Sequence, residues 1–477
     1  MQSPIRAGDI SFGVSAAFLF GVFAANSGWN LYRIGAVGMV TIVAIALIFR
    51  SRGFWKYAAL ILFATAFGAV YYITFVDLQA AHTHIPSGKG VAFFGVVKEE
   101  PKPAGNFTMI VVGLSRPYAD TIDLFTTPND VQFHYGDELW IKGSMSASNR
   151  AGEPAAMFFP ELRVIASHEG FWLEELVIDL KAAIVQKLAQ LLPPDQAALL
   201  AGIMIGSAGT MSAALKSQME TSGTTYIVNM YGYKIAIITA ALAASLKDHI
   251  PRRVLLCMTL GTIVLFVLAS GGAISAARAA VMGSFAVVAR GTGRVFSARN
   301  AVTFAALGMV LLNATLLTDA AFQLSFLSFL GIYYLGPAID YYFHWTAARD
   351  GGVLRWKEHA MLSFATNLAI LPVAMNTFGD FSLTSLASNI LIMLPWLALI
   401  ALGALVALLG FIAPALAFIA TQVVGVLLQY ELFIIHIFAI IVVPMPAVFG
   451  SAFAIVFYYA ALIIFIHQHA APPQENN

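Results

Sequence analysis

The sequence predicts a polytopic α-helical membrane protein, with about 11–12 transmembrane segments and one inserted extracytoplasmic small β-barrel (OB-like) domain. Three observations support this fold class. The 477 residues are 59% hydrophobic and only 11% charged. Apolar runs recur at lengths close to the roughly 20 residues that cross a hydrocarbon core. A single long hydrophilic stretch, at about 76–169, interrupts them and alternates apolar and polar residues as strands do.

Charge orients the first three apolar segments, which lie at about 11–26, 34–49 and 54–75. The loop between the second and third segments reads RSRGFWK and carries Arg50, Arg52 and Lys56. Short basic loops stay on the cytoplasmic side of a membrane. The N-terminus is therefore expected in the cytoplasm, and the chain after residue 75 is expected outside.

The hydrophilic stretch contains five short runs with strand-like alternation, separated by turn residues. These runs are GVAFFGVVKEE, FTMIVVGLS, TIDLFTT, DELWIKGSMSA and ELRVIASHE. Five short strands fit an OB-like barrel, and an open β-sandwich also fits. The stretch has seven basic and eleven acidic residues, so it lacks the positive charge typical of nucleic-acid-binding barrels. A docking or positioning role is therefore an equal alternative to DNA binding.

Residues 170–225 have the pattern of amphipathic or interfacial helices. Apolar positions recur at helical spacing over residues 171–192, with charged residues between them, and Pro193-Pro194 ends the run. This helix is predicted either to lie on the outer leaflet or to pack on the barrel. Two shorter helices follow, at Asp195–Ile205 and Met211–Glu220.

Residues 226–467 form a nearly continuous membrane domain, followed by a short polar tail at 468–477. Its predicted segments are 226–246, 254–270, 273–290, 300–316, 319–336, 358–378, 385–410, 412–443 and 446–467. Basic residues cluster in alternate loops, which places those loops on one side through residue 410. The 412–443 segment is too long for one simple span, so a broken or re-entrant helix is an open alternative there. The chain thus divides into 1–75, 76–169, 170–225, 226–467 and 468–477.

Polar side chains within the apolar segments are the main functional candidates, because desolvating them in hydrocarbon is expensive. Arg278 lies near the middle of one segment, and Lys234 lies well inside another. A polar path through the membrane is the first hypothesis, and an interhelical hydrogen-bonding cluster is the alternative. The path candidates are Arg278, Lys234, Asn229, Tyr231, Gln323 and Ser325. Gly232, Pro372 and Pro395 are candidate structural helix breaks.

No residue pattern predicts catalysis, a cofactor or a metal. His82-Thr83-His84 is not followed by the aspartate of a metallo-β-lactamase motif, and the glycine-lysine pair at Gly88-Lys89 lacks the rest of a phosphate-binding loop. The single cysteine, Cys257, excludes intramolecular disulfides. The protein is therefore expected to be neither a hydrolase nor an ATPase.

Several motifs in order resemble those of the ComEC-type competence proteins, a family of DNA internalisation channels. The stretch Leu199–Ile235 is similar to the family's segment that leads into an I-S-G-x-H pattern. SAARAAVMG at Ser275–Gly283 resembles its R-A-x-x-M segment, and FQLSF at Phe322–Phe326 matches its F-Q-L-S-F run. Leu368–Leu397 resembles a later pattern of proline, F-G, serine, asparagine and proline.

The resemblance implies a passive inner-membrane conduit for single-stranded DNA, with Arg278 and Lys234 contacting phosphates. It implies partners: a surface DNA receptor, a separate nuclease and a cytoplasmic ATPase or helicase, with a homo-oligomer also compatible. Two departures matter. Tyr231 and Lys234 stand where the family has serine and histidine, and the chain resembles a variant lacking the C-terminal metallo-β-lactamase-like domain.

Two other functions fit the same residues. A secondary transporter of a small anionic solute could use the cations together with a proton relay at Glu431 and His436. A structural membrane scaffold would use the polar residues only to hold its helices together.

Overall fold

A computed structural model describes residues 7–27, 54–82, 88–104, 107–115, 118, 121–127, 133–146, 155–206, 211–228, 230–292, 297–344, 356–378, 384–441 and 452–469. The predicted segment at 34–49, the candidate Asn229 and most of the polar tail lie outside these residues. The chain divides into two compact units. The first comprises 1–180, 238–273 and 277–319, and the second comprises 181–237, 274–276 and 320–477.

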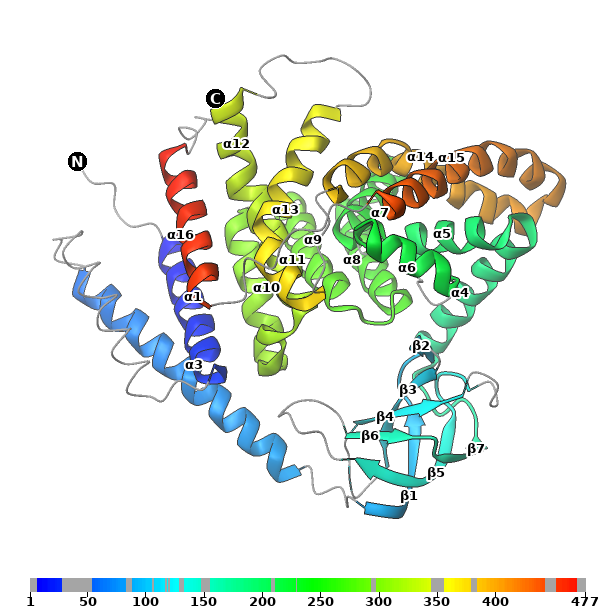
Figure 1. Ribbon diagram of the computed structural model, residues 1–477, viewed down its shortest axis with the longest axis horizontal. Coiled ribbons are helices and arrows are strands. Elements are labelled where there is room, and N and C mark those ends of the chain that lie inside the picture. The colour runs from blue at the N-terminus through cyan, green and yellow to red at the C-terminus, as the bar shows by residue number, and fades with distance from the viewer. Residues whose placement is uncertain are drawn as a thin grey trace. The chain divides into compact units, whose positions relative to one another are not determined.

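The hydrophilic stretch forms a closed β-barrel (Figure 1). The strands are β1 (Gly88–Val97), β2 (Lys102–Ala104), β3 (Phe107–Leu114), β4 (Thr121–Thr126), β5 (Glu138–Ser146), β6 (Ala155–Phe158) and β7 (Glu161–Ala166). The ring runs β1-β3-β4-β6-β5, and β1 pairs with β5 to close it. Alternate side chains of β3 and β4 fill the interior, as the period of two requires. The predicted OB-like barrel is confirmed, and the open sandwich is wrong.

The strand prediction missed one strand of the ring. All five expected runs contain a strand, but the last one, β7, pairs with residues 138–142 of β5 and has no pairing with β4 among the described strands. The closing strand is β6, which pairs in parallel with β4 and antiparallel with β5. β6 has only four residues, AAMF, which is too short for an alternating pattern to stand out.

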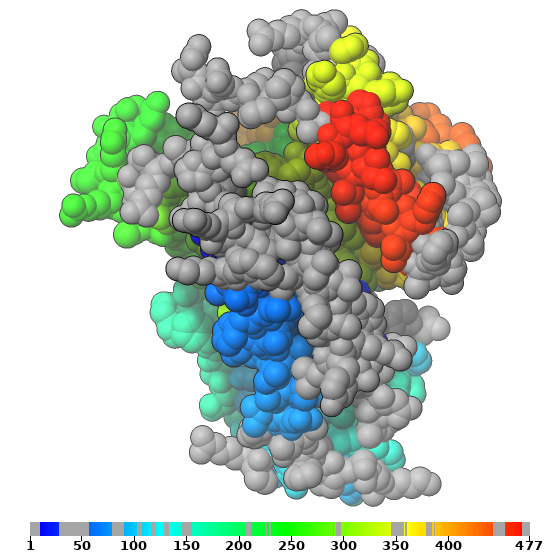
Figure 2. Space-filling view, turned by 90° about the vertical axis from the view of Figure 1, so that its left-hand side faces the viewer, coloured from blue at the N-terminus to red at the C-terminus, as the bar shows by residue number. Residues whose placement is uncertain are grey.

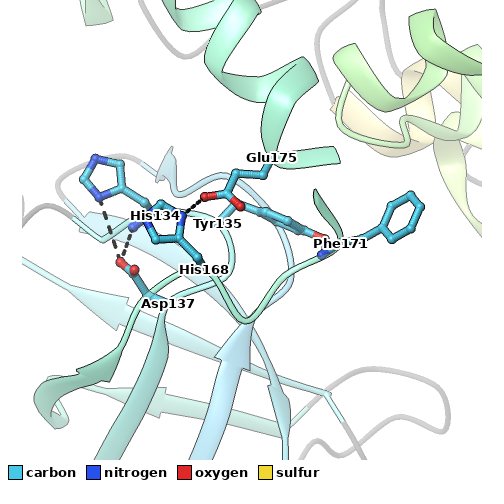
Figure 3. A network of polar contacts seen from close by, with 6 residues as sticks. All are labelled: His134, Tyr135, Asp137, His168, Phe171 and Glu175. Atoms are coloured by element: carbon cyan, nitrogen blue, oxygen red, sulfur yellow. Dashed lines mark hydrogen bonds and ion pairs between the residues drawn. The ribbon is translucent and has the colours of Figure 1, made fainter. Parts of the chain in front are cut away.

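The barrel is joined to the following helix, α4 (Trp172–Leu191), by a network of polar contacts (Figure 3). The amide of Phe171, just before the helix, donates to the hydroxyl of Tyr135 over 3.1 Å, and this hydroxyl donates to Glu174 over 2.8 Å. In a capping box, the third helical residue accepts a hydrogen bond directly from the backbone amide that precedes the helix. Glu174 is the third residue of α4, and the Tyr135 hydroxyl bridges it to that amide. Burial raises the pKa of the Tyr135 phenol, so the hydroxyl keeps the proton that it donates. The barrel therefore caps α4 with its own side chain.

The first unit also contains α1 (Ala7–Asn26), α3 (Phe54–His82), α8 (Arg252–Ala269), most of α9 (Ile274–Thr292), α10 (Ala298–Leu312) and the short helix η2 (Ala314–Thr318). Helices α1 and α3 approach closely through glycines. A Cβ atom at Gly21 would lie 2.0 Å from the carbonyl oxygen of Thr65, and one at Gly68 would lie 2.2 Å from that of Phe18. Small residues at such crossings are typical of helix packing in membranes.

The second unit is helical. It contains α5 (Pro194–Ile205), α6 (Ala213–Thr221), η1 (Thr225–Ile227), α7 (Tyr231–Leu246, through Ile237), α11 (Ala320–Leu330), η3 (Gly331–Leu335), α12 (Gly336–Phe343), α13 (Trp356–Phe378), α14 (Ser385–Ile412), α15 (Pro414–Ile440) and α16 (Ala452–Gln468). Helices α14 and α15 pack side by side as a hairpin (Figure 1). The segment suspected of a break is one continuous helix, α15, of 27 residues. The broken or re-entrant alternative is therefore not what the structure shows.

Six described helices are long and apolar enough to cross a membrane, and shorter apolar helices accompany them. Their outward faces carry large apolar side chains. Phe63 on α3 is 67% exposed, and Phe457 on α16 is 70% exposed. Figure 2 shows surface of both α3 (blue) and α16 (red). Exposed apolar faces of this extent fit contact with lipid, and the predicted fold class of a polytopic helical membrane protein with a small barrel is confirmed.

Candidate functional site

The second unit brings together segments that are far apart in the sequence. The end of α5, the turn between α6 and α7 and the first half of α14 share one core with α15, and Tyr233 in the first turn of α7 packs on Trp396 of that core. These segments contain much of two motif stretches singled out in the sequence, Leu199–Ile235 and Leu368–Leu397. We refer to this region as the motif core.

Lys234 is buried beside the motif core, with a side chain that is 1% exposed. Its ammonium group donates to the carbonyl oxygen of Gly202 over 2.9 Å and to that of Val228 over 2.7 Å. It also lies 5.1 Å from the ring centre of Tyr231. Gly202 is in the last turn of α5, where its carbonyl also accepts from the Gly206 amide over 2.9 Å and where the negative end of the helix dipole favours a cation. Lys234 therefore ties α5 to the start of α7 in this structure.

Tyr231 is buried against the end of α5. Gly206 caps this helix in the left-handed conformation, with φ of 92°. A Cβ atom at Gly206 would lie 2.6 Å from the ring of Tyr231. Glycine is therefore required here both by the backbone angle and by the tyrosine. Gly232 lies in the first turn of α7, which begins at Tyr231.

Small polar residues line the contact between the α6–α7 turn and α14. The Ser388 hydroxyl donates to the carbonyl oxygen of Ser222 over 2.9 Å, and the hydroxyls of Ser222 and Thr224 lie 2.8 Å apart. Gly223 has φ of 70°, and a Cβ atom there would lie 2.4 Å from Cβ of Ser385. Sequence reasoning missed this cluster, although the family pattern of a glycine in the first stretch and serine and asparagine in the second could have indicated it.

The α14–α15 hairpin buries one acidic side chain, that of Glu431. Buried positions recur three and four residues apart on both helices, and Glu431 occupies one of them on α15 with 0% exposure. Neither carboxylate oxygen has a hydrogen-bond partner within the described part of the chain. His436 is instead exposed, with Nδ1 3.5 Å from Nε2 of Gln218. The proposed relay between Glu431 and His436 is thus not assembled in this arrangement.

The remaining path candidates lie elsewhere. Arg278 belongs to the first unit, where it is partly buried on α9 and its Nη1 lies 3.5 Å from the sulfur of Met282. Gln323 and Ser325 lie on α11 in the second unit, Gln323 partly buried and Ser325 buried. The structure therefore brings Lys234 and Tyr231 together, while Gln323 and Ser325 belong to another helix of the same unit and Arg278 belongs to the first unit.

The described residues offer no group of three or more His, Cys, Asp or Glu side chains that could hold a metal ion. The chemistry of the motif core is that of hydrogen bonds and buried charge. These interactions can hold helices in position. That Lys234 and Tyr231 lie along a polar path through the membrane stays a prediction.

Comparison with known proteins gives one match. The family model described as "Competence protein" matches residues 203–471, which is more than half of the chain. Neither the search of curated proteins nor that of solved structures found a match. The matched range covers the helices from the end of α5 to α16, and the family indicates a role in DNA uptake. The chain is a multi-pass membrane protein that belongs to the competence protein family.

Proposed function

We propose that this protein is an inner-membrane channel that conducts single-stranded DNA into the cytoplasm during natural transformation. The observation that carries the proposal is the competence-family match over 203–471, because it covers five of the six candidate membrane spans in the described residues and not the barrel. The barrel then serves as an extracytoplasmic docking domain, and the N-terminus lies in the cytoplasm. A DNA receptor, a nuclease and a cytoplasmic ATPase or helicase are supplied by other proteins.

A polyanion that crosses hydrocarbon needs positive charge and polar groups along its route. Arg278 meets this need best, since its helix also offers small residues such as Ser275, Ala279 and Gly283 that let a strand or a neighbouring helix approach closely. Lys234 serves the channel in another way, because its ammonium group already donates to two backbone carbonyls. We assign Arg278 to phosphate contact and Lys234 with Tyr231 to shaping the route, together with Gln323 and Ser325.

Replacement of Arg278 tests the proposal. Arg278→Ala is expected to abolish transformation and uptake of labelled single-stranded DNA, while protein level and membrane insertion stay normal. Arg278→Lys should retain part of the activity because it keeps the charge. The matched control is Arg253→Ala, at an exposed arginine in the first turn of α8, which should transform normally. Normal transformation by Arg278→Ala would remove this residue from the mechanism.

The small-anion transporter is less well supported, because its proton relay requires Glu431 and His436 to exchange a proton. Glu431 is fully buried, whereas His436 is exposed. Movement of a small anion by purified protein in liposomes, with no uptake of single-stranded DNA by the same preparation, would overturn the channel proposal.

A further inference from the structure

Two of the prolines in the described part of the chain lie inside helices, Pro372 in α13 and Pro395 in α14. Both helices continue through the proline, so neither residue ends its helix. Proline has no amide hydrogen, so the carbonyl group four residues earlier loses its helical donor. The two affected carbonyls are those of Leu368 in α13 and Leu391 in α14.

Each of these carbonyls receives a hydrogen bond from a tyrosine on another helix. The hydroxyl of Tyr458 on α16 donates to the carbonyl oxygen of Leu368 over 2.7 Å. Its neighbour Tyr459 donates to the next carbonyl, that of Ala369, over 3.1 Å. The hydroxyl of Tyr430 on α15 donates to the carbonyl oxygen of Leu391 over 3.2 Å.

The same arrangement thus occurs twice, in two helix pairs that share no residues. Within a bilayer no water is available to donate a hydrogen bond to a backbone carbonyl. A proline-containing helix therefore needs a substitute hydrogen-bond donor from a neighbouring helix. A tyrosine hydroxyl differs from the amide it replaces, because it sits on a side chain of a second helix. Rotation of that side chain, or a shift of the second helix, removes the bond without unfolding the first helix.

We propose that Tyr430 and Tyr458 are positioning residues that hold α14 and α13 at proline hinges, and that releasing them lets each helix bend as the channel opens. The part of this proposal that concerns bending during channel opening rests on the proposed role in DNA passage. The part that concerns holding the helices, which we call the locks, rests only on two hydrogen bonds. Tyr430 donates to the carbonyl four residues before Pro395, and Tyr458 donates to the carbonyl four residues before Pro372.

The locks can be tested by a rescue experiment on the purified full-length protein. Tyr430→Phe leaves the Leu391 carbonyl without its donor and should raise the ratio of unfolded to folded protein about ten-fold. Adding Pro395→Ala gives residue 395 an amide hydrogen that can bond this carbonyl, so the double variant should regain the lost stability. The matched control joins Tyr458→Phe with Pro395→Ala, which do not share a carbonyl, and there the Tyr458→Phe loss should persist. Equal rescue by matched and mismatched pairs would overturn the locks.

Uptake of labelled single-stranded DNA tests the hinge. The Tyr430→Phe, Pro395→Ala double variant should be folded yet take up at least about ten-fold less DNA, because a regular helix has no proline interruption at which to bend. If stability were the whole role of the pair, uptake would return together with stability, and that result would overturn the hinge. A wild-type protein that conducts no DNA would contradict the proposed function instead. The stabilities of the matched and mismatched double variants would still test whether the two tyrosines stabilise the proline-containing helices.

Discussion

At the scale of single residues, Lys234 shows how a buried amine in a membrane domain can be satisfied by backbone carbonyls, with no acidic partner among the described residues. Its two acceptors are backbone carbonyls, one of them in the last turn of α5. The partial negative charge of a helix C-terminus compensates the ammonium, and the ring of Tyr231 lies beside it. Lys234 therefore links α5 to the segment before α7 through hydrogen bonds to backbone carbonyls.

Lys234→Met should destabilise the protein by roughly 2 kcal/mol or more, because two carbonyls lose a charged donor at once. Methionine is close to lysine in volume, so the change tests the hydrogen bonds more than the packing. Chemical denaturation of the purified protein measures the effect, with Lys247→Met at an exposed lysine after α7 as the control. Unchanged stability combined with lost DNA uptake would instead place the Lys234 amine on the DNA route.

At the scale of elements, the long helices follow directly from apolar length, and the barrel strands from alternation. What the sequence could not show are the bonds that join distant segments. Tyr430 lies 39 residues from Leu391, and Tyr458 lies 90 residues from Leu368. A proline inside an apolar run indicates an interruption, and only the packing of a second helix reveals that the helix continues. Glu431 is visible in the sequence as a charge, but its isolation depends on the α14–α15 pairing.

The junction between the barrel and α4 should respond to pH. The Nδ1–H of His168 donates to the Glu175 carboxylate, and this hydrogen bond, followed by the charge of the same carboxylate, raises the pKa of His168 above its ordinary value (Figure 3). A raised folded-state pKa means that the pair stabilises the junction fully below the unfolded-state value, and that this contribution is lost as pH rises through the folded-state value.

The melting temperature of the protein should therefore fall less steeply between acid and mildly alkaline pH in His168→Gln than in the wild type. Glu175→Gln should flatten the profile in the same way, and the two changes combined should add nothing further. An unchanged pH profile in both single variants would show that the pair does not contribute to the junction.

At the scale of the whole molecule, family membership and fold class were accessible from the order of the motifs and from composition. The grouping of site residues was not. Lys234 and Tyr231 lie together beside the motif core, while Arg278 belongs to the other unit, although all three lie in apolar segments with similar polar interruptions. Apolar runs indicate which residues enter the membrane, and helix packing decides which of them meet.

The predicted orientation places the barrel outside and the loop after α7 in the cytoplasm, because Lys247, Arg252 and Arg253 cluster there. Since Cys257 is the one cysteine of the chain, a Cys257→Ser background allows single reporters to be introduced. Lys142→Cys, at an exposed position on β5, should react with a membrane-impermeant maleimide in intact spheroplasts.

Asp248→Cys is the matched reporter at an exposed position in the loop after α7, and it should react only after the membrane is permeabilised. Both positions are exposed, so the two cysteines should react equally well with the maleimide once it reaches them. A difference between them in intact spheroplasts therefore reports the side of the bilayer on which each lies. Labelling of Asp248→Cys in intact spheroplasts, with Lys142→Cys protected, would reverse the orientation. The barrel would then lie in the cytoplasm, which the docking role proposed for it does not allow.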